Sequence, residues 1–175
     1  SNICTAQALL AIMAGMYAVY HGPKRLRMIA ERIHGLSILL SEALGKLGYK
    51  QVNEYFFDTL KLDLGNLVDA IHAEALNAGL NLHYKGPIIT ISLDETTHVA
   101  DLEKLVHVFA KIKGKNGNII DLDELKSGIK SVSIPKKLQR TSAYLSHPIF
   151  NSHHAEHEML RYIKSLEAKD LSLCH

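Results

Sequence analysis

A cluster of histidines and carboxylates near the C-terminal end offers the most chemistry in this sequence. His153, His154 and His157 lie beside Glu156 and Glu158. His153 and His157 are four positions apart, so on a helix their imidazoles would share one face, as metal ligands do. However, the spacing falls where a helix would begin, and a chain with 11 histidines produces such clusters by chance. We therefore favour polar capping and linker contacts, and we expect no metal site.

Other residue patterns that support catalysis are weak. The sequence has no Gly-x-Ser-x-Gly, no Gly-rich phosphate loop and no Gly-x-Gly-x-x-Gly. Cys4 borders an apolar helical pattern, where a thiol is a core residue rather than a nucleophile. Asp94 and Glu95, with Thr96 and Thr97, fit a strand-to-helix connection in which a threonine caps the helix. We expect no catalytic residue in this chain.

The composition is that of a globular domain and excludes several classes of protein. The 175 residues are 47% hydrophobic and 22% charged, with 20 Lys and Arg against 18 Asp and Glu. The near balance of charge argues against a dedicated nucleic-acid binder. No apolar run reaches the roughly 20 residues that a membrane span needs. The two cysteines form no metal or redox motif, and no signal peptide opens the chain, so we expect a reduced, intracellular, non-secreted protein.

Hydrophobic periodicity predicts an α+β fold in which helices pack on one face of a small antiparallel sheet. Alternating residues predict a strand over residues 56–64 and a hairpin over 80–93 that turns at Gly86 and Pro87. Asn66 is expected to cap the helix between them. The predicted helices cover residues 5–20, 23–47, 66–78, 96–109, 119–129 and 155–169, with a polar break at 113–118 and an irregular stretch at 131–148.

The first predicted helix has an unusual composition. No charged residue occurs before Lys24, and a helix without a charged face is buried on most sides. The chain also opens without Met and stops directly after a charged helical pattern. We therefore expect a piece cut from a longer protein, whose first helix exposes apolar surface and promotes artificial dimerisation or aggregation.

Several stretches in a fixed order carry a family resemblance. They are SNICTAQALL at 1–10, MAGMYAVYHG at 13–22, FFDTL at 56–60, ISLDET at 91–96, HPIFN at 147–151, EMLRYI at 158–163 and LEAKDLSL at 166–173. Together they resemble the P-protein of the glycine cleavage system, the decarboxylating glycine dehydrogenase. The resemblance spans the whole chain and is least distinctive at residues 113–133.

The resemblance implies a much longer pyridoxal-phosphate enzyme of the aminotransferase-like fold, built from two similar halves. Residues 1–133 would be lead-in helices and the small C-terminal domain of the first half. Residues 134–175 would be a helical connector and the first helix of the catalytic half, which carries the Schiff-base lysine beyond residue 175. The family decarboxylates glycine and passes the aminomethyl group to the lipoyl arm of the H-protein.

Other implications concern partners and location. The expected partners are the catalytic half of the same enzyme and the lipoylated H-protein, with the full chain forming a homodimer. Neither nucleic acid nor a membrane is an expected partner. The expected location is the bacterial cytoplasm or the mitochondrial matrix. The cofactor would be bound by the catalytic half, and none is expected in this piece.

One segment is a candidate for the active-site edge or the interface between the halves. Its polar side chains lie between two packed units, and the candidate residues are His147, Asn151, His153, His154 and Glu156. One departure from the family is visible here, because the usual Ser-Glu-Thr-Glu is Ala-Glu-His-Glu at residues 155–158. The two hydroxyl groups, and any hydrogen bond they make at the helix start, are therefore lost.

An alternative from another class stays open on the sequence alone. Many regulatory modules combine a small sheet with helices, and a fold does not fix a function. A free-standing interaction or ligand-binding domain would be encoded by a gene that ends near His175, whereas a segment of the P-protein would continue into the catalytic half.

Overall fold

The fold was analysed in a computed structural model that describes residues 6–115, 120–128, 134–171 and 173. The chain divides into two compact units. The sheet unit is Ala30–Gln139, and the connector unit combines Ser1–Ile29 with Arg140–His175. Helix α1 (Ala6–Lys46) contributes to both units. Among the described helices, none combines the length and apolar character that crossing a membrane requires.

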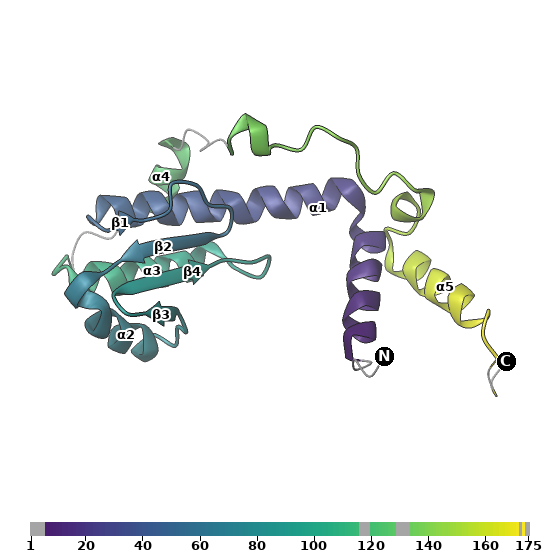
Figure 1. Ribbon diagram of the computed structural model, residues 1–175, viewed down its shortest axis with the longest axis horizontal. Helices are drawn as coiled ribbons and strands as arrows, with labels where there is room; N and C mark the ends of the chain where they lie inside the picture. Colours follow the sequence, from purple (N-terminus) through teal and green to yellow (C-terminus); the bar gives the residue numbers. More distant parts are fainter. Residues whose placement is uncertain (1–5, 116–119, 129–133, 172, 174–175) are drawn as a thin grey trace. The chain divides into compact units, whose positions relative to one another are not determined.

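The sheet unit contains four antiparallel strands in the order β1-β2-β4-β3 (Figure 1). The strands are β1 (Lys50–Gln51), β2 (Thr59–Asp63), β3 (His83–Lys85) and β4 (Ile88–Ser92). Leu60 pairs with Ile91, and Leu62 pairs with Ile89. Residues that pair directly across two strands share one face of the sheet, so these four buried side chains form its apolar face.

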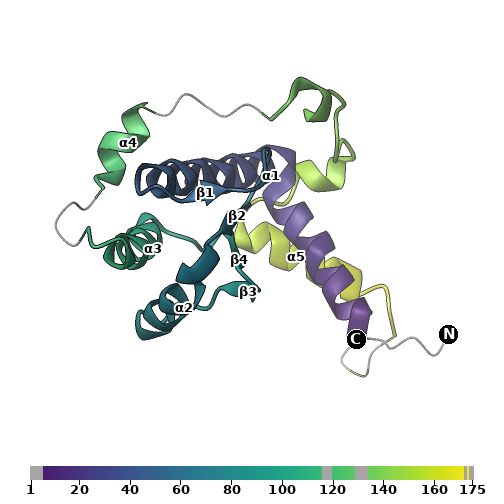
Figure 2. The same cartoon turned by 60° about the vertical axis from the view of Figure 1, so that its left-hand side comes forward.

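Helices cover that apolar face. Helices α2 (Val68–Asn77), α3 (Val99–Ile112) and the end of α1 lie on the same side of the sheet (Figure 2). The single hydrophobic core draws on α1 through Leu40 and Leu44, on α2 through Ile71, and on α3 through Leu102 and Phe109. Helix α4 (Leu122–Gly128) adds to the same core. The predicted α+β architecture, with helices on one face of an antiparallel sheet, is confirmed.

Most predicted elements are present, with shifted ends. The predicted strand at 56–64 is shorter, and the two-residue strand β1 was not predicted, because two residues give no readable alternation. The predicted helix at 119–129 corresponds to α4, and its residues 119 and 129 lie outside the described residues, as do 116–118 of the polar break. The predicted irregular stretch holds the short 3-10 helix η2 (Lys136–Leu138) in its described part.

Two predicted helix caps are wrong. Asn66 lies inside the 3-10 helix η1 (Gly65–Leu67), so α2 begins after Leu67 without a side-chain cap. Helix α3 is capped at His98 rather than at a threonine, and the Asp101 carboxylate accepts a hydrogen bond from the His98 N–H at 2.9 Å. The Asp101 carboxylate thus satisfies the N–H of the cap residue, whereas a threonine cap would have accepted from an N–H of the first turn.

The threonines serve the connection that precedes α3. The Asp94 carboxylate accepts hydrogen bonds from the Thr96 N–H at 2.9 Å and from the Thr96 hydroxyl at 2.7 Å. These bonds lower the pKa of Asp94. Arg32 of α1 donates to the carbonyls of Glu95 at 3.2 Å and Thr97 at 2.7 Å. The structural role expected for the Asp94–Thr97 segment is therefore confirmed, although its threonines are not the cap.

The described elements of the connector unit are helices. It contains the first part of α1, the 3-10 helix η3 (Pro148–Asn151) and α5 (Glu156–Glu167). Helix α1 is interrupted at Gly22, whose backbone angles are φ 63° and ψ 177°, and Pro23 follows. The sequence predicted this interruption, since proline lacks the N–H of a helical hydrogen bond and glycine permits a positive φ.

Candidate functional site: the connector at the break in helix α1

The break in α1 interrupts the helical hydrogen-bond ladder between the part before Gly22 and the part that begins at Pro23. Pro23 has no N–H, so the helical ladder stops there. Two side chains of the connector reach the break from more than a hundred positions away. The His154 Nδ1 lies 2.8 Å from the Tyr20 carbonyl oxygen, and the Tyr144 hydroxyl donates to the Pro23 carbonyl at 2.5 Å. The connector therefore hydrogen-bonds α1 on both sides of Gly22.

Gly22 is buried where the connector approaches most closely. A Cβ at this position would lie 2.6 Å from the Phe150 carbonyl oxygen and 2.7 Å from the His154 Cε1. Real Cβ atoms do not come so close to other heavy atoms. The positive φ and the lack of space both require glycine here.

Arg25 adds a third contact at the same place. Its guanidinium donates to the His154 carbonyl at 3.3 Å and lies 5.9 Å from the centre of the Tyr20 ring. The His21 ring is 4.2 Å from the Tyr17 ring. Burial, and then the charge of Arg25, lower the pKa of His21, which favours its neutral form.

The first two candidate residues shape the turn before α5. The His147 Nδ1 accepts a hydrogen bond from the Ile149 N–H at 3.2 Å, where η3 begins. The Asn151 amide donates to the carbonyls of Leu145 at 3.1 Å and His147 at 3.2 Å. Leu145 has a φ of 48°, in the left-handed region, which costs free energy for residues other than glycine. The Asn151 bond holds the carbonyl of that residue.

The start of α5 is held by a carboxylate. Glu158 accepts hydrogen bonds from the N–H groups of Ala155 at 3.0 Å and His154 at 3.1 Å. The bond from Ala155 is the largest cause of its lowered pKa, and the bond from His154 also contributes. Glu158 thus stabilises the start of α5. The hydroxyls that the family resemblance leads one to expect at positions 155 and 157 are absent here.

Of the remaining candidates, His153 precedes α5 and Glu156 is its first residue. The His153 ring stacks on the Tyr162 ring, with 4.6 Å between centroids and 13° between planes. Glu156 is exposed in the first turn of the helix. An open groove of about 410 Å³ lies beside this stack, lined by Ser152, His153, Glu158, Arg161, Tyr162 and Ser165.

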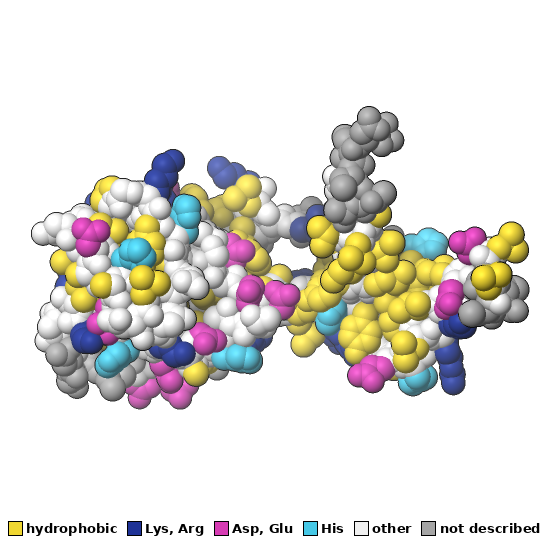
Figure 3. All heavy atoms as spheres, turned by 90° about the horizontal axis from the view of Figure 1, so that it is seen from below, with side chains coloured by type: hydrophobic (Ala, Val, Ile, Leu, Met, Phe, Trp, Pro, Cys, Tyr) yellow, Lys and Arg dark blue, Asp and Glu magenta, His cyan; other side chains and the backbone are white. Residues whose placement is uncertain are grey.

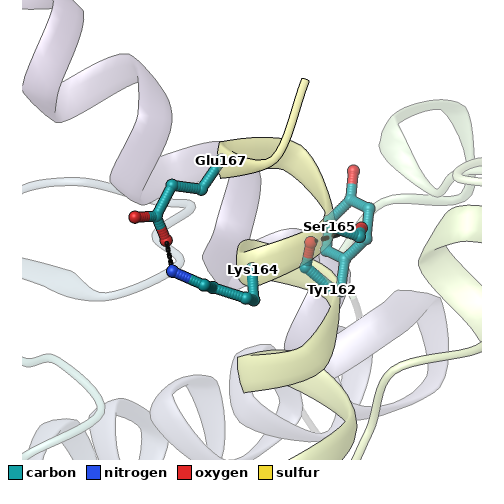
Figure 4. A network of polar contacts seen from close by, with 4 residues as sticks. All are labelled: Tyr162, Lys164, Ser165 and Glu167. Carbon is teal, nitrogen blue, oxygen red and sulfur yellow. Dashed lines mark hydrogen bonds and ion pairs between the residues drawn. The ribbon is translucent and has the colours of Figure 1, made fainter. Parts of the chain in front are cut away.

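The polar groups farther along α5 pair with each other. Lys164 and Glu167 form an ion pair at 3.0 Å, and the Ser165 hydroxyl donates to the Tyr162 carbonyl at 2.7 Å (Figure 4). Figure 4 shows the ion pair and the Tyr162 ring on different sides of the helix. Within the described ranges, no three or more His, Cys, Asp or Glu residues gather as a metal site would require.

Comparison with known proteins identifies the family. The family profile "Glycine cleavage system P-protein" matches residues 1–109. The chain belongs to the glycine cleavage system P-protein family. It is 49% identical to a glycine dehydrogenase (decarboxylating) of Cupriavidus metallidurans over 174 residues, which are 99% of this chain and 17% of that protein.

Two further relatives of the same name agree. Identity is 49% over 176 residues with the protein of Paraburkholderia xenovorans and 47% over 175 residues with that of Vibrio cholerae. These alignments cover 99% and 100% of this chain, and 18% of each relative. The chain thus spans less than a fifth of the P-protein relatives it matches, and the family predicted from the sequence is confirmed.

The described lysine side chains of this P-protein segment are exposed. A lysine that forms a Schiff base needs a lowered pKa, which desolvation or a neighbouring cation provides. Every lysine whose side chain is described lies on the exposed surface. Lys111, for example, pairs with Glu74 at 2.7 Å on the outside of the sheet unit.

The sequence selected part of the connector site. His147, Asn151, His153 and His154 all form contacts within the connector unit, but only His154 reaches the break in α1. Tyr144 was missed because an isolated tyrosine in an irregular stretch carries no sequence signal. The Gly-Pro pair marked the break itself, although not the segment that would close around it.

Proposed function

We propose that this chain is a structural segment of a pyridoxal-phosphate-dependent glycine dehydrogenase of the glycine cleavage system. The complete enzyme would decarboxylate glycine and transfer the aminomethyl group to the lipoyl group of the H-protein. The cofactor and its lysine would belong to the part of the protein beyond this chain, and the full chain would form a homodimer. The family membership and the fraction of the relatives that the chain spans support this proposal.

The observation that carries the structural role is the uncovered apolar surface of the connector unit. In the first part of α1, Leu9 is 63% exposed, Leu10 is 66% exposed and Ile12 is 58% exposed. Hydrophobic side chains gather over this part of the molecule (Figure 3). Val19 is the one buried hydrophobic residue among the described positions of the unit. Such a surface requires other protein to cover it.

Helix α5 supports the same interpretation. Leu160 is 67% exposed and Ile163 is 42% exposed, and none of the α5 residues is buried. An amphipathic helix gains its stability from burying its apolar face. The rest of the P-protein, more than four fifths of the relatives' length, would supply that cover. This agrees with the exposed first helix that the sequence predicted.

The candidate residues enter this proposal as neighbours of the active site. We place His147, Asn151, His153, His154 and Glu156 at the active-site edge or at the interface between the two halves. Substituting His153, His154 and Glu156 in the full-length enzyme should reduce glycine turnover or cofactor affinity. Unchanged turnover and unchanged affinity would contradict this placement.

The test of the overall function uses the full-length gene product. We expect it to exchange the carboxyl group of glycine with labelled bicarbonate only when pyridoxal phosphate and H-protein are both supplied. The 175-residue chain alone should show no exchange. A natural gene product that ends near His175 and catalyses no exchange would instead support a free-standing interaction domain.

A further inference from the structure

We infer that Tyr144 and His154 form a clasp on the break of α1, and that this clasp positions the polypeptide that follows α5. The inference rests on the proposed function, because the polypeptide after α5 would be the catalytic half. Both residues act through other groups, so they are positioning residues rather than catalytic ones.

The clasp holds the two sides of the break separately. Tyr20 precedes Gly22 and accepts its bond from His154, while Pro23 follows Gly22 and accepts its bond from Tyr144. A helix interrupted by glycine and proline lacks the ladder that would otherwise fix its two parts. The connector adds one side-chain hydrogen bond on each side of Gly22, so both parts of α1 are tied to the connector at the break.

The clasp is also coupled to α5 through the backbone of His154. The N–H of His154 donates to the Glu158 carboxylate in the first turn of α5, and its carbonyl accepts from Arg25 of α1. His154 therefore contacts the break in α1 with its ring and the start of α5 with its main-chain N–H. In the proposed enzyme the catalytic half would follow α5, so moving His154 would move the start of that half.

The chemistry of the His154 bond makes it testable by isosteric replacement. A carbonyl oxygen only accepts, so Nδ1 must carry the hydrogen and the ring donates from that nitrogen. Asparagine places an amide nitrogen at the same number of bonds from Cα as Nδ1. Glutamine places its nitrogen one bond farther out, where Nε2 lies. The hydrogen bond to the Tyr20 carbonyl should therefore be kept in His154→Asn and lost in His154→Gln and His154→Leu.

The experiment uses the full-length enzyme loaded with pyridoxal phosphate. Hydrogen exchange of the main-chain amides in residues 20–25 and in α5 would be compared for His154→Asn, His154→Gln, His154→Leu and Tyr144→Phe. His157→Leu is the matched control, because His157 is exposed on α5 two positions after Ala155. Glycine–bicarbonate exchange would be measured per bound cofactor, with kcat and KM separated.

We expect His154→Leu, His154→Gln and Tyr144→Phe to exchange faster at the break and in α5, by about fivefold to thirtyfold. This is the range expected for losing one such hydrogen bond. The kcat per bound cofactor should fall in the same variants while KM for glycine changes less, since positioning acts on the reacting geometry. His154→Asn and His157→Leu should behave like the wild type.

Two results would overturn the clasp itself: unchanged exchange in His154→Leu and Tyr144→Phe, or a loss in His154→Asn as large as in His154→Leu. Faster exchange with no change in kcat per bound cofactor would overturn its positioning role. Failure of the proposed function is a separate result. A wild-type enzyme without glycine-dependent exchange overturns that proposal and the catalytic part of this one, while the hydrogen-exchange comparison still decides whether the clasp exists.

Discussion

Tyr49 offers the sharpest test of how the sheet unit is held together. It is buried, and its hydroxyl donates to the Phe109 carbonyl at 2.9 Å. That carbonyl lies near the end of α3, where the Lys113 N–H bonds to Ala110 instead, so the tyrosine satisfies a carbonyl that the helix leaves unpaired. The Tyr49 and Phe109 rings also meet edge to face, with centroids 4.9 Å apart.

The substitution Tyr49→Phe removes the hydrogen bond and keeps the ring. The buried Phe109 carbonyl then has no partner, which costs about 1–3 kcal/mol of the free energy of unfolding. The matched control is Tyr84→Phe. The Tyr84 hydroxyl oxygen is buried and makes no hydrogen bond to any described residue, so its removal should be neutral or stabilising.

The assay is urea unfolding of the chain, followed by far-ultraviolet circular dichroism. Tyr49→Phe should lower the midpoint, and Tyr84→Phe should leave it unchanged or raise it. Equal losses in the two variants, or a larger loss in Tyr84→Phe, would refute the idea that hydrogen-bond satisfaction distinguishes these two tyrosines.

The pH dependence of the free energy of unfolding is a second test of the Tyr49 site. Burial raises the pKa of Tyr49 from 10.0 to about 12. The folded state therefore keeps this proton more tightly than the unfolded state, and the resulting stability is complete below pH 10 and decreases as the pH rises toward 12. The difference is worth at most roughly 2.7 kcal/mol. Tyr49→Phe should lose less stability than the wild type between these two pH values.

Four further substitutions test other features. In the full-length protein, Gly22→Ala should accelerate hydrogen exchange around the break by at least tenfold, because the positive φ alone costs about 1–3 kcal/mol. The control is Gly35→Ala, at an open helical position, which should stabilise the chain by about 0.5–1 kcal/mol in urea unfolding. Asp101→Ala should lower the free energy of unfolding by about 0.5–2 kcal/mol by removing the acceptor at the start of α3. The folded pKa of Glu158 is lowered, so its stabilisation of α5 should decrease as the pH falls from the ordinary glutamate pKa through this lower value. Amide exchange in α5 should become faster over that range, and Glu158→Gln should remove this dependence.

The sequence predicted the sheet unit well where the pattern was long and regular. The hairpin was readable from the alternation of Leu80, Leu82 and Tyr84 and from the turn at Gly86. The order of the strands was not predicted, because β1 has two residues and pairs only through its contact with β2. The caps were misplaced for a related reason. Thr96 and Asn66 are good caps by type, but the turns around them decide which backbone N–H groups remain unpaired.

The candidate site was only partly readable. His154 was selected for its place in a polar cluster, whereas its contact is with a carbonyl 134 positions earlier. Tyr144 reaches Pro23 across 121 positions. Such distances in sequence carry no local pattern, since neither hydrophobic period nor spacing relates the partners.

The sequence by itself determined the family, the helical and extended segments and the interruption of α1, because each depends on residue types in local order. Gly22 and Pro23 end the helical ladder wherever they occur in a helix. Only the tertiary structure decided which side chains contact the carbonyls of Tyr20 and Pro23. Their partners come from a distant segment, and folding selects them because polar groups removed from water need hydrogen bonds from whichever donors packing brings near.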